Sequence, residues 1–192
     1  MTKLLRPALS LFVALSVLTG LLYPLAITGI AQLLFPAAAN GSVVSRGPVE
    51  IGSALIGQPL RDPAHFWSRP SATSPMPDNG DASSGSNLGP SNPALADAVK
   101  GRIAALRAAD PGNLAPVPVD LVTASASGLD PHISVAAARW QVARVARATG
   151  LPAARVRALV DRHSDEPLAG WLGEARVNVL LLNLDLDQAR AH

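Results

Sequence analysis

Residues 125–134, SASGLDPHIS, bring together the residue types of a hydrolytic active site. In such a site Ser125 or Ser127 would be the nucleophile, His132 the general base and Asp130 the group that orients the histidine. The spacing argues against this chemistry, because a nucleophile elbow needs GxSxG and no glycine stands two residues before Ser127. An exported serine hydrolase therefore stays an alternative, to be tested with an acylating probe.

Backbone roles explain the same stretch more simply. Gly128 allows a positive φ, Asp130-Pro131 begins a turn, and Ser134 can cap the helix that follows. We therefore expect a connection between two elements here and no catalytic residue.

Other common reaction centres have no motif in the chain. There is no cysteine, no GxxxxGK[ST] or GxGxxG phosphate loop and no HExxH zinc motif. The four histidines stand singly at positions 65, 132, 163 and 192. We expect neither a metal site nor a tightly bound cofactor.

The N-terminus is typical of a membrane anchor. No charged residue occurs from Pro7 to Ser45, and residues 7–35 exceed the roughly 20 apolar residues that span a bilayer. The basic residues before them favour a cytoplasmic N-terminus. A cleaved signal peptide is the alternative, since AAAN at 37–40 fits a cleavage site, but its apolar core would be about 7 to 15 residues long.

Several residues in this helix are unusual for a simple anchor. Small and hydroxyl-bearing side chains let transmembrane helices approach and hydrogen bond to one another. We therefore predict that this helix docks on other transmembrane helices, with a solitary anchor as the alternative. The predicted contact residues are Thr19, Gly20, Tyr23, Pro24, Thr28, Gly29 and Gln32.

The rest of the chain predicts one α+β domain outside the membrane. The expected boundaries are a cytoplasmic N-terminus at 1–6, a transmembrane helix at 7–35, a linker at 36–50 and the extracytoplasmic α+β domain at 51–192. The patterns predict short strands within 41–60, a long polar loop at 73–92, helices at 93–109, 135–149 and 152–163, and strands at 117–122 and 175–188.

Residues 141–162 also resemble a helix-turn-helix, which makes a membrane-tethered DNA-binding regulator a further alternative. Phosphate contacts would come from Arg139, Arg144, Arg147, Arg155, Arg157 and Arg162. The predicted topology places these arginines away from DNA, so we expect no nucleic-acid partner.

Six ordered motifs give the chain a resemblance to a known family across nearly its whole length. They are TGLLYPLAITGIAQ (19–32), GSALIGQPL (52–60), FWSRPSA (66–72), SGSNLGPSN (84–92), VPVDLVTASASGLDPHIS (117–134) and RVNVLLLNLDLD (176–187). With them the chain resembles the KdpC family, the C subunits of Kdp-type potassium-transporting P-type ATPases.

This resemblance implies a non-catalytic subunit of a high-affinity potassium import complex in the bacterial inner membrane. Its partners would be the ATP-hydrolysing subunit (KdpB), the potassium-selective subunit (KdpA), the small KdpF and membrane lipid. In this family the C subunit stabilises the assembly and is described as a catalytic chaperone that raises the ATP affinity of the hydrolysing subunit.

The resemblance also implies an ATP contact. The nearest candidates for a nucleotide or partner contact are Ser125, Ser127, Gly128, Asp130 and Gln141. The predicted topology puts these residues outside, whereas a P-type ATPase binds nucleotide in the cytoplasm. We therefore expect the effect on ATP affinity to be transmitted through transmembrane contacts, as a coupling between sites.

Overall fold

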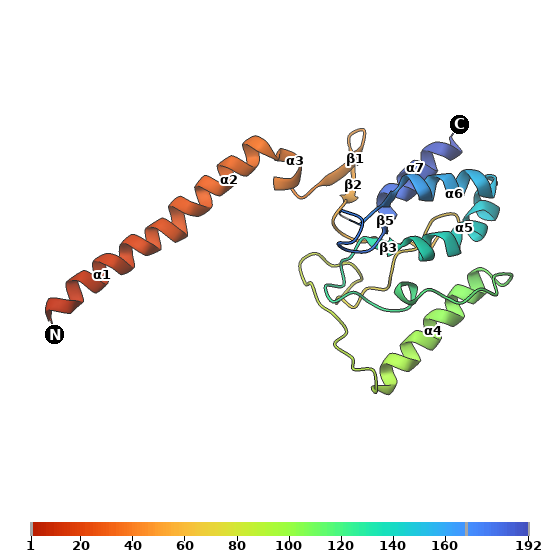
Figure 1. Ribbon diagram of the computed structural model, residues 1–192, viewed down its shortest axis with the longest axis horizontal. Coiled ribbons are helices and arrows are strands. Elements are labelled where there is room, and N and C mark those ends of the chain that lie inside the picture. Colours follow the sequence, from red (N-terminus) through yellow and green to blue (C-terminus); the bar gives the residue numbers. More distant parts are fainter. Residues whose placement is uncertain (1, 168, 192) are drawn as a thin grey trace. The chain divides into compact units, whose positions relative to one another are not determined.

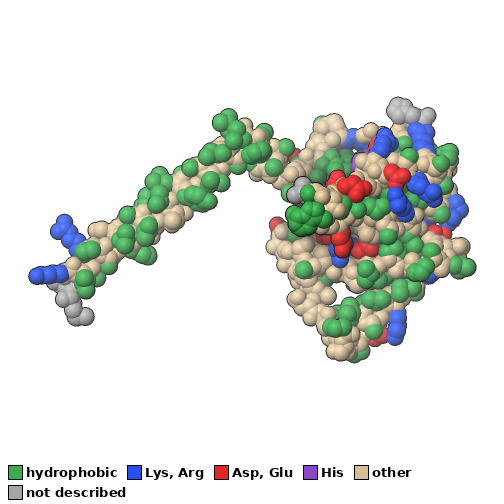
Figure 2. All heavy atoms as spheres, in the orientation of Figure 1, with side chains coloured by type: hydrophobic (Ala, Val, Ile, Leu, Met, Phe, Trp, Pro, Cys, Tyr) green, Lys and Arg blue, Asp and Glu red, His purple; other side chains and the backbone are tan. Residues whose placement is uncertain are grey.

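The computed structural model describes residues 2–167 and 169–191, and the chain divides into two compact units, residues 1–51 and 52–192. The first unit is dominated by one long helix, built from α1 (Thr2–Val17), a π-helical turn (Leu18–Leu22) and α2 (Tyr23–Leu34) (Figure 1). Hydrophobic side chains cover it along its whole length, with basic side chains at its N-terminal end (Figure 2). The part from Lys3 to Leu34 is long and apolar enough to cross a membrane.

The π-helical turn accommodates a proline inside the helix. Pro24 has no N–H, and in a regular α-helix its ring would clash with the carbonyl group of Gly20. The chain widens just before it, and the N–H of Tyr23 reaches the carbonyl of Leu18, five residues back. The Thr19 hydroxyl also donates to a carbonyl in the preceding turn, that of Leu15, at 2.8 Å.

A short connection follows the long helix. It contains a single helical turn, α3 (Pro36–Ala39), and a hairpin of β1 (Val43–Arg46) and β2 (Val49–Ser53). The hairpin confirms the short strands predicted after residue 40.

Besides α4 (Pro93–Ala109), the second unit packs three helices with a small antiparallel sheet. The helices are α5 (Val135–Thr149), α6 (Ala153–Arg162) and α7 (Val179–Arg190), and the strands lie in the order β3 (His132–Ser134), β5 (Arg176–Asn178), β4 (Ser164–Asp165). The central strand pair places Ile133 opposite Val177, and both side chains are buried. The predicted mixture of helices and strands is confirmed.

Caps define the predicted helices as the sequence indicated. α4 runs from Pro93 to Ala109, and the Asn92 side chain accepts a hydrogen bond from its first turn. The Ser134 hydroxyl accepts from the N–H of Ala137 at the start of α5. That helix ends at Gly150, whose φ of 73° is the left-handed conformation that glycine adopts at low cost.

The strand predicted at 117–122 is wrong. This segment forms a 3₁₀ turn, Val119–Leu121, after an irregular stretch. Prolines at 116 and 118 remove two backbone donors, so the segment cannot complete a strand ladder. The alternation of valines indicated a strand that the prolines do not allow.

The strand predicted at 175–188 is confirmed only at β5, and the rest is wrong because the residues from Val179 on belong to α7. Asn178 caps the helix by accepting from the N–H of Leu181 at 3.1 Å. The buried Val179, Leu182 and Leu186 then follow at helical spacing, which the alternating leucines concealed. Leucine is a strong helix former, and tertiary packing follows this propensity here.

Candidate functional site

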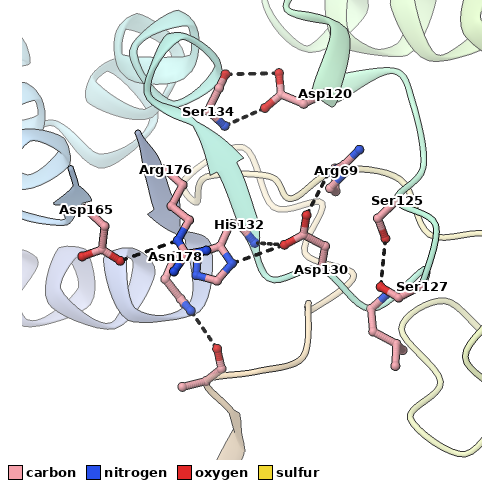
Figure 3. Close-up of polar contacts among 12 residues, drawn as sticks. Arg69, Asp120, Ser125, Ser127, Asp130, His132, Ser134, Asp165, Arg176 and Asn178 are labelled. Atoms are coloured by element: carbon pink, nitrogen blue, oxygen red, sulfur yellow. Dashed lines mark hydrogen bonds and ion pairs between the residues drawn. The ribbon is translucent and has the colours of Figure 1, made fainter. Parts of the chain in front are cut away.

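The 125–130 turn uses both of its serine hydroxyls to hold its own backbone (Figure 3). The N–H of Gly128 donates to Ser125 Oγ at 2.8 Å and the N–H of Leu129 donates to Ser127 Oγ at 3.2 Å. The two hydroxyls are also 3.2 Å apart. Within residues 2–167 and 169–191 neither hydroxyl hydrogen bonds to His132, so the structure does not assemble the hydrolase triad.

The polar loop after residue 70 closes over this turn. The N–H of Ser84 donates to the Ser127 carbonyl at 2.9 Å, and the Ser71 hydroxyl donates to the Gly128 carbonyl at 2.7 Å. A Cβ on Gly128 would lie 2.5 Å from the Ser84 carbonyl oxygen and 2.7 Å from a methyl group of Thr73. Gly128 is therefore required both by its φ of 67° and by the closeness of the loop.

Asp130 links this turn to the segment before the loop. One carboxylate oxygen pairs with Arg69 Nη1 at 2.8 Å, and the other accepts the backbone N–H of His132 at 3.0 Å and lies 3.3 Å from its ring nitrogen Nδ1 (Figure 3). Burial alone would raise the pKa of Asp130, but the bonds from His132 and Arg69 outweigh it and lower the pKa to about 2. The carboxylate is thus a charged structural link at neutral pH.

Gln141 lies in the core and its amide group is occupied. Its side-chain oxygen accepts from the N–H of Trp67 at 2.8 Å, and its side-chain nitrogen donates to the Trp67 carbonyl at 3.1 Å. Arg144 donates to the same oxygen and stacks over the Trp67 ring. The structure therefore gives Gln141 a packing role, and its predicted nucleotide or partner contact stays a prediction.

The predicted transmembrane contact residues remain open on the helix surface. Gly20, Pro24, Thr28 and Gln32 recur every four residues, which is the spacing of a helix ridge. A side chain at either Gly20 or Gly29 would meet nothing within 4 Å. Gln32 differs, because its amide pairs with that of Asn40 at 3.0 and 3.3 Å.

Four of the six arginines in the helix-turn-helix hypothesis have intramolecular partners. Arg144 is buried, with only 3% of its surface exposed. The other three, Arg139, Arg147 and Arg162, pair with Asp161, Asp110 and Asp185. These contacts explain the arginine-rich helices as a folded helical hairpin.

Among the described residues, no group of three or more His, Asp or Glu side chains is arranged to hold a metal ion.

Arg69, Ser71 and Asn183 support the site and were not singled out from the sequence. The first two lie in the FWSRPSA motif, an irregular segment without periodicity, so no local pattern identified their contacts. Asn183 stands among leucines, and a polar residue in an apolar run is a signal for a buried hydrogen bond.

Together these features define a class: a protein whose described residues form one helix of membrane-spanning length and a mixed α/β unit in which polar side chains hold loops in place. The chain belongs to the KdpC family, described as "K+-transporting ATPase, c chain", whose model matches residues 5–188. The family indicated by the six motifs is confirmed.

Curated relatives are similar over the full length. The potassium-transporting ATPase KdpC subunit of Variovorax paradoxus is 67% identical over 191 residues, covering 100% of this chain and 99% of the relative. The subunit of the same name from Polaromonas naphthalenivorans is 68% identical, covering 97% and 95%. That of Ralstonia nicotianae is 64% identical, covering 95% and 90%.

Proposed function

We propose that the chain is the non-catalytic C subunit of an ATP-driven potassium import complex in the bacterial inner membrane. The observation that carries this proposal is the full-length similarity to subunits named for potassium-transporting ATPases. Its partners are the ATP-hydrolysing subunit, the potassium-selective subunit, the small KdpF and lipid.

The long helix is the proposed anchor and assembly element. Its basic N-terminal end lies in the cytoplasm and residues 52–192 lie outside, in keeping with the charge bias of the sequence. The ridge of Gly20, Pro24 and Thr28 presents small side chains and backbone for close helix contact. The pairing of Gln32 with Asn40 supports a fixed end to the helix rather than a further interhelical hydrogen bond.

The proposed effect on the partner is that of a catalytic chaperone, which raises its affinity for ATP. The serine hydroxyls and Asp130 are already bonded to backbone and side chains of this chain, and Gln141 is buried. These contacts favour transmission through the assembled helices over direct binding of nucleotide. The outer surface of the 125–130 turn is then a contact for a partner subunit.

Reconstitution tests the membership and the ATP effect separately. The full chain is co-expressed with the other subunits of a Kdp complex, and co-purification with the ATP-hydrolysing subunit is measured in detergent. Both proposals are supported if the chain co-purifies and the complex has a lower KM for ATP than the same complex without this chain. Co-purification with an unchanged KM removes the chaperone role alone, and absence of co-purification contradicts membership.

Photolabelling of the assembled complex with an ATP analogue tests the direct contact. Label confined to the ATP-hydrolysing subunit is the expected result. Label on residues 125–141 of this chain would contradict transmission through the helices and establish a nucleotide contact at the turn.

A further inference from the structure

A recess lies between α4 and the irregular segment that precedes the polar loop. Apolar and polar groups share its walls about equally: prolines, leucines, alanines and the Trp67 ring lie beside two serines, one aspartate and three arginines. Two of these, Arg61 and Arg69, come from the irregular segment, and Arg102 comes from α4. Such a combination of apolar side chains with a few converging charged groups is typical of small-ligand sites.

Two of the three guanidinium groups lack a neutralising carboxylate. Arg61 forms no ion pair or hydrogen bond with any residue in 2–167 or 169–191, and Arg102 donates only to the uncharged carbonyl of Val122, at 2.8 Å. Burial, and then the like charge of Arg61, lower the pKa of Arg102. The two cations therefore face a shared space at an electrostatic cost that an anion would relieve.

The third arginine is only partly satisfied. Arg69 pairs with Asp130 through Nη1, but its Nε is buried and has no hydrogen-bond partner among the described residues. A buried donor without an acceptor is rare in folded proteins and indicates a missing partner.

Among the described residues one acid, Asp78, lines the recess, and it does not neutralise these charges. Asp78 forms no ion pair with any of the three arginines in the described part of the chain, and a Cβ on Gly57 would lie 2.5 Å from its carboxylate oxygen. Burial raises the pKa of Asp78, and no arginine lowers it. The carboxylate therefore lies apart from the guanidinium groups, and the arginine side of the recess keeps its positive charge.

We propose that this recess is a binding site for a phosphate group, held between Arg61 and Arg102. Guanidinium groups match the geometry of phosphate oxygens and bind them through charge-assisted hydrogen bonds. The phosphate has two possible sources, a lipid headgroup and free inorganic phosphate. In the first case the apolar part of the walls would contact the rest of the lipid. Arg69 and Ser71 line the recess and also bond to the 125–130 turn, whereas Arg61 and Arg102 make no printed bond to that turn among the described residues. The proposed site does not depend on the proposed role in potassium import.

The test is calorimetric titration of inorganic phosphate into the full chain in a neutral detergent. Arg61→Gln should weaken binding at least about tenfold, because a hydrogen bond to a charged group is lost. Arg61 is exposed and forms no hydrogen bond or ion pair with a described residue, so this variant should keep the fold even if Arg102→Gln proves unstable. Arg155→Gln, at an exposed arginine of α6, is the matched control and should bind as the wild type does.

Nanodiscs then distinguish the two sources of phosphate. If phosphatidylglycerol discs compete with added phosphate and phosphatidylcholine discs do not, the ligand is an anionic headgroup. Equal phosphate binding in both discs means a free phosphate. No phosphate binding by the wild type, or equal binding by wild type and Arg61→Gln, overturns the proposal. The same holds if Arg61→Gln abolishes co-purification while phosphate never binds, since the site would then receive a partner's carboxylate.

Discussion

Asn183 holds the backbone of Phe66 as a neighbouring strand would. The N–H of Phe66 donates to Asn183 Oδ1 at 2.8 Å, and Asn183 Nδ2 donates to the Phe66 carbonyl at 2.9 Å. Gln141 makes the same pair of bonds with the next residue, Trp67. Two side-chain amides, one from α7 and one from α5, thus fix the segment that carries Arg69 to the helical core.

Replacing Asn183 with leucine should destabilise the second unit by about 3 kcal/mol. The substitution leaves the buried N–H and carbonyl of Phe66 without partners, and each such group costs about 1–3 kcal/mol. Gln188→Leu, an exposed amide on the same helix, is the control and should change stability little. Urea unfolding of the full chain in detergent, followed by tryptophan fluorescence, measures both. Equal midpoints for the two variants would show that the Asn183 bonds contribute nothing net.

Two glycines with nearly the same φ should respond very differently to alanine. Gly150→Ala meets open space, so its cost is about 1–2 kcal/mol for the left-handed conformation alone. Gly128→Ala carries the same cost and also places a methyl group 2.5 Å from the Ser84 carbonyl oxygen. Its effect should exceed that of Gly150→Ala by at least about 1 kcal/mol, since overpacking alone costs that much. The comparison uses the same unfolding measurement, and equal losses would mean that the loop over the turn yields freely.

Local signals in the sequence predicted the capped helices well. Asn92 with Pro93, and Ser134 with Gly150, specify helix ends through short-range hydrogen bonds and backbone conformation, so no tertiary information is needed. The leucines of α7 gave no comparable local signal. Leucines at positions 180, 182, 184 and 186 are compatible both with a strand and with part of a helix. The choice depended on Asn178 as a cap and on packing against α6, which the pattern alone does not contain.

In the candidate site too, some residues could be predicted from local sequence and others could not. Gly128, Asp130 and Ser134 were predicted to hold backbone, and the structure gives each of them that role. The residues that hold the turn from outside, Arg69 and Ser71, are about 60 residues away in the chain. Their contacts follow from the tertiary fold and leave no periodic trace in the sequence.

Acid should destabilise the wild type more than Asp130→Asn. The pKa of Asp130 is about 2 in the folded chain and 3.8 without these contacts, so its contribution is fully present above about pH 4 and is lost as the pH falls toward 2. The shift corresponds to about 2 kcal/mol. Unfolding free energies at pH 2 to 5 should therefore fall more steeply for the wild type than for Asp130→Asn. Asp97→Asn, at an exposed carboxylate of α4, is the control and should keep the wild-type slope. Parallel curves for the wild type and Asp130→Asn would contradict a charged link at this position.

Leucine at Gly20 should weaken assembly of the complex, whereas leucine at Ala26 should not. Gly20 lies on the ridge with Pro24 and Thr28, and a leucine there holds a neighbouring helix away from the backbone. Ala26 is two residues from both Pro24 and Thr28, which puts it about 200° around α2 and opposite this ridge. The comparison therefore tests the Gly20 ridge against the face of Thr19 and Tyr23. We expect Gly20→Leu to reduce co-purification of the ATP-hydrolysing subunit about tenfold, which corresponds to about 1.4 kcal/mol. Ala26→Leu adds one carbon fewer than Gly20→Leu and controls for expression and insertion. If both variants co-purify as the wild type does, the helix is a solitary anchor and assembly depends on the second unit.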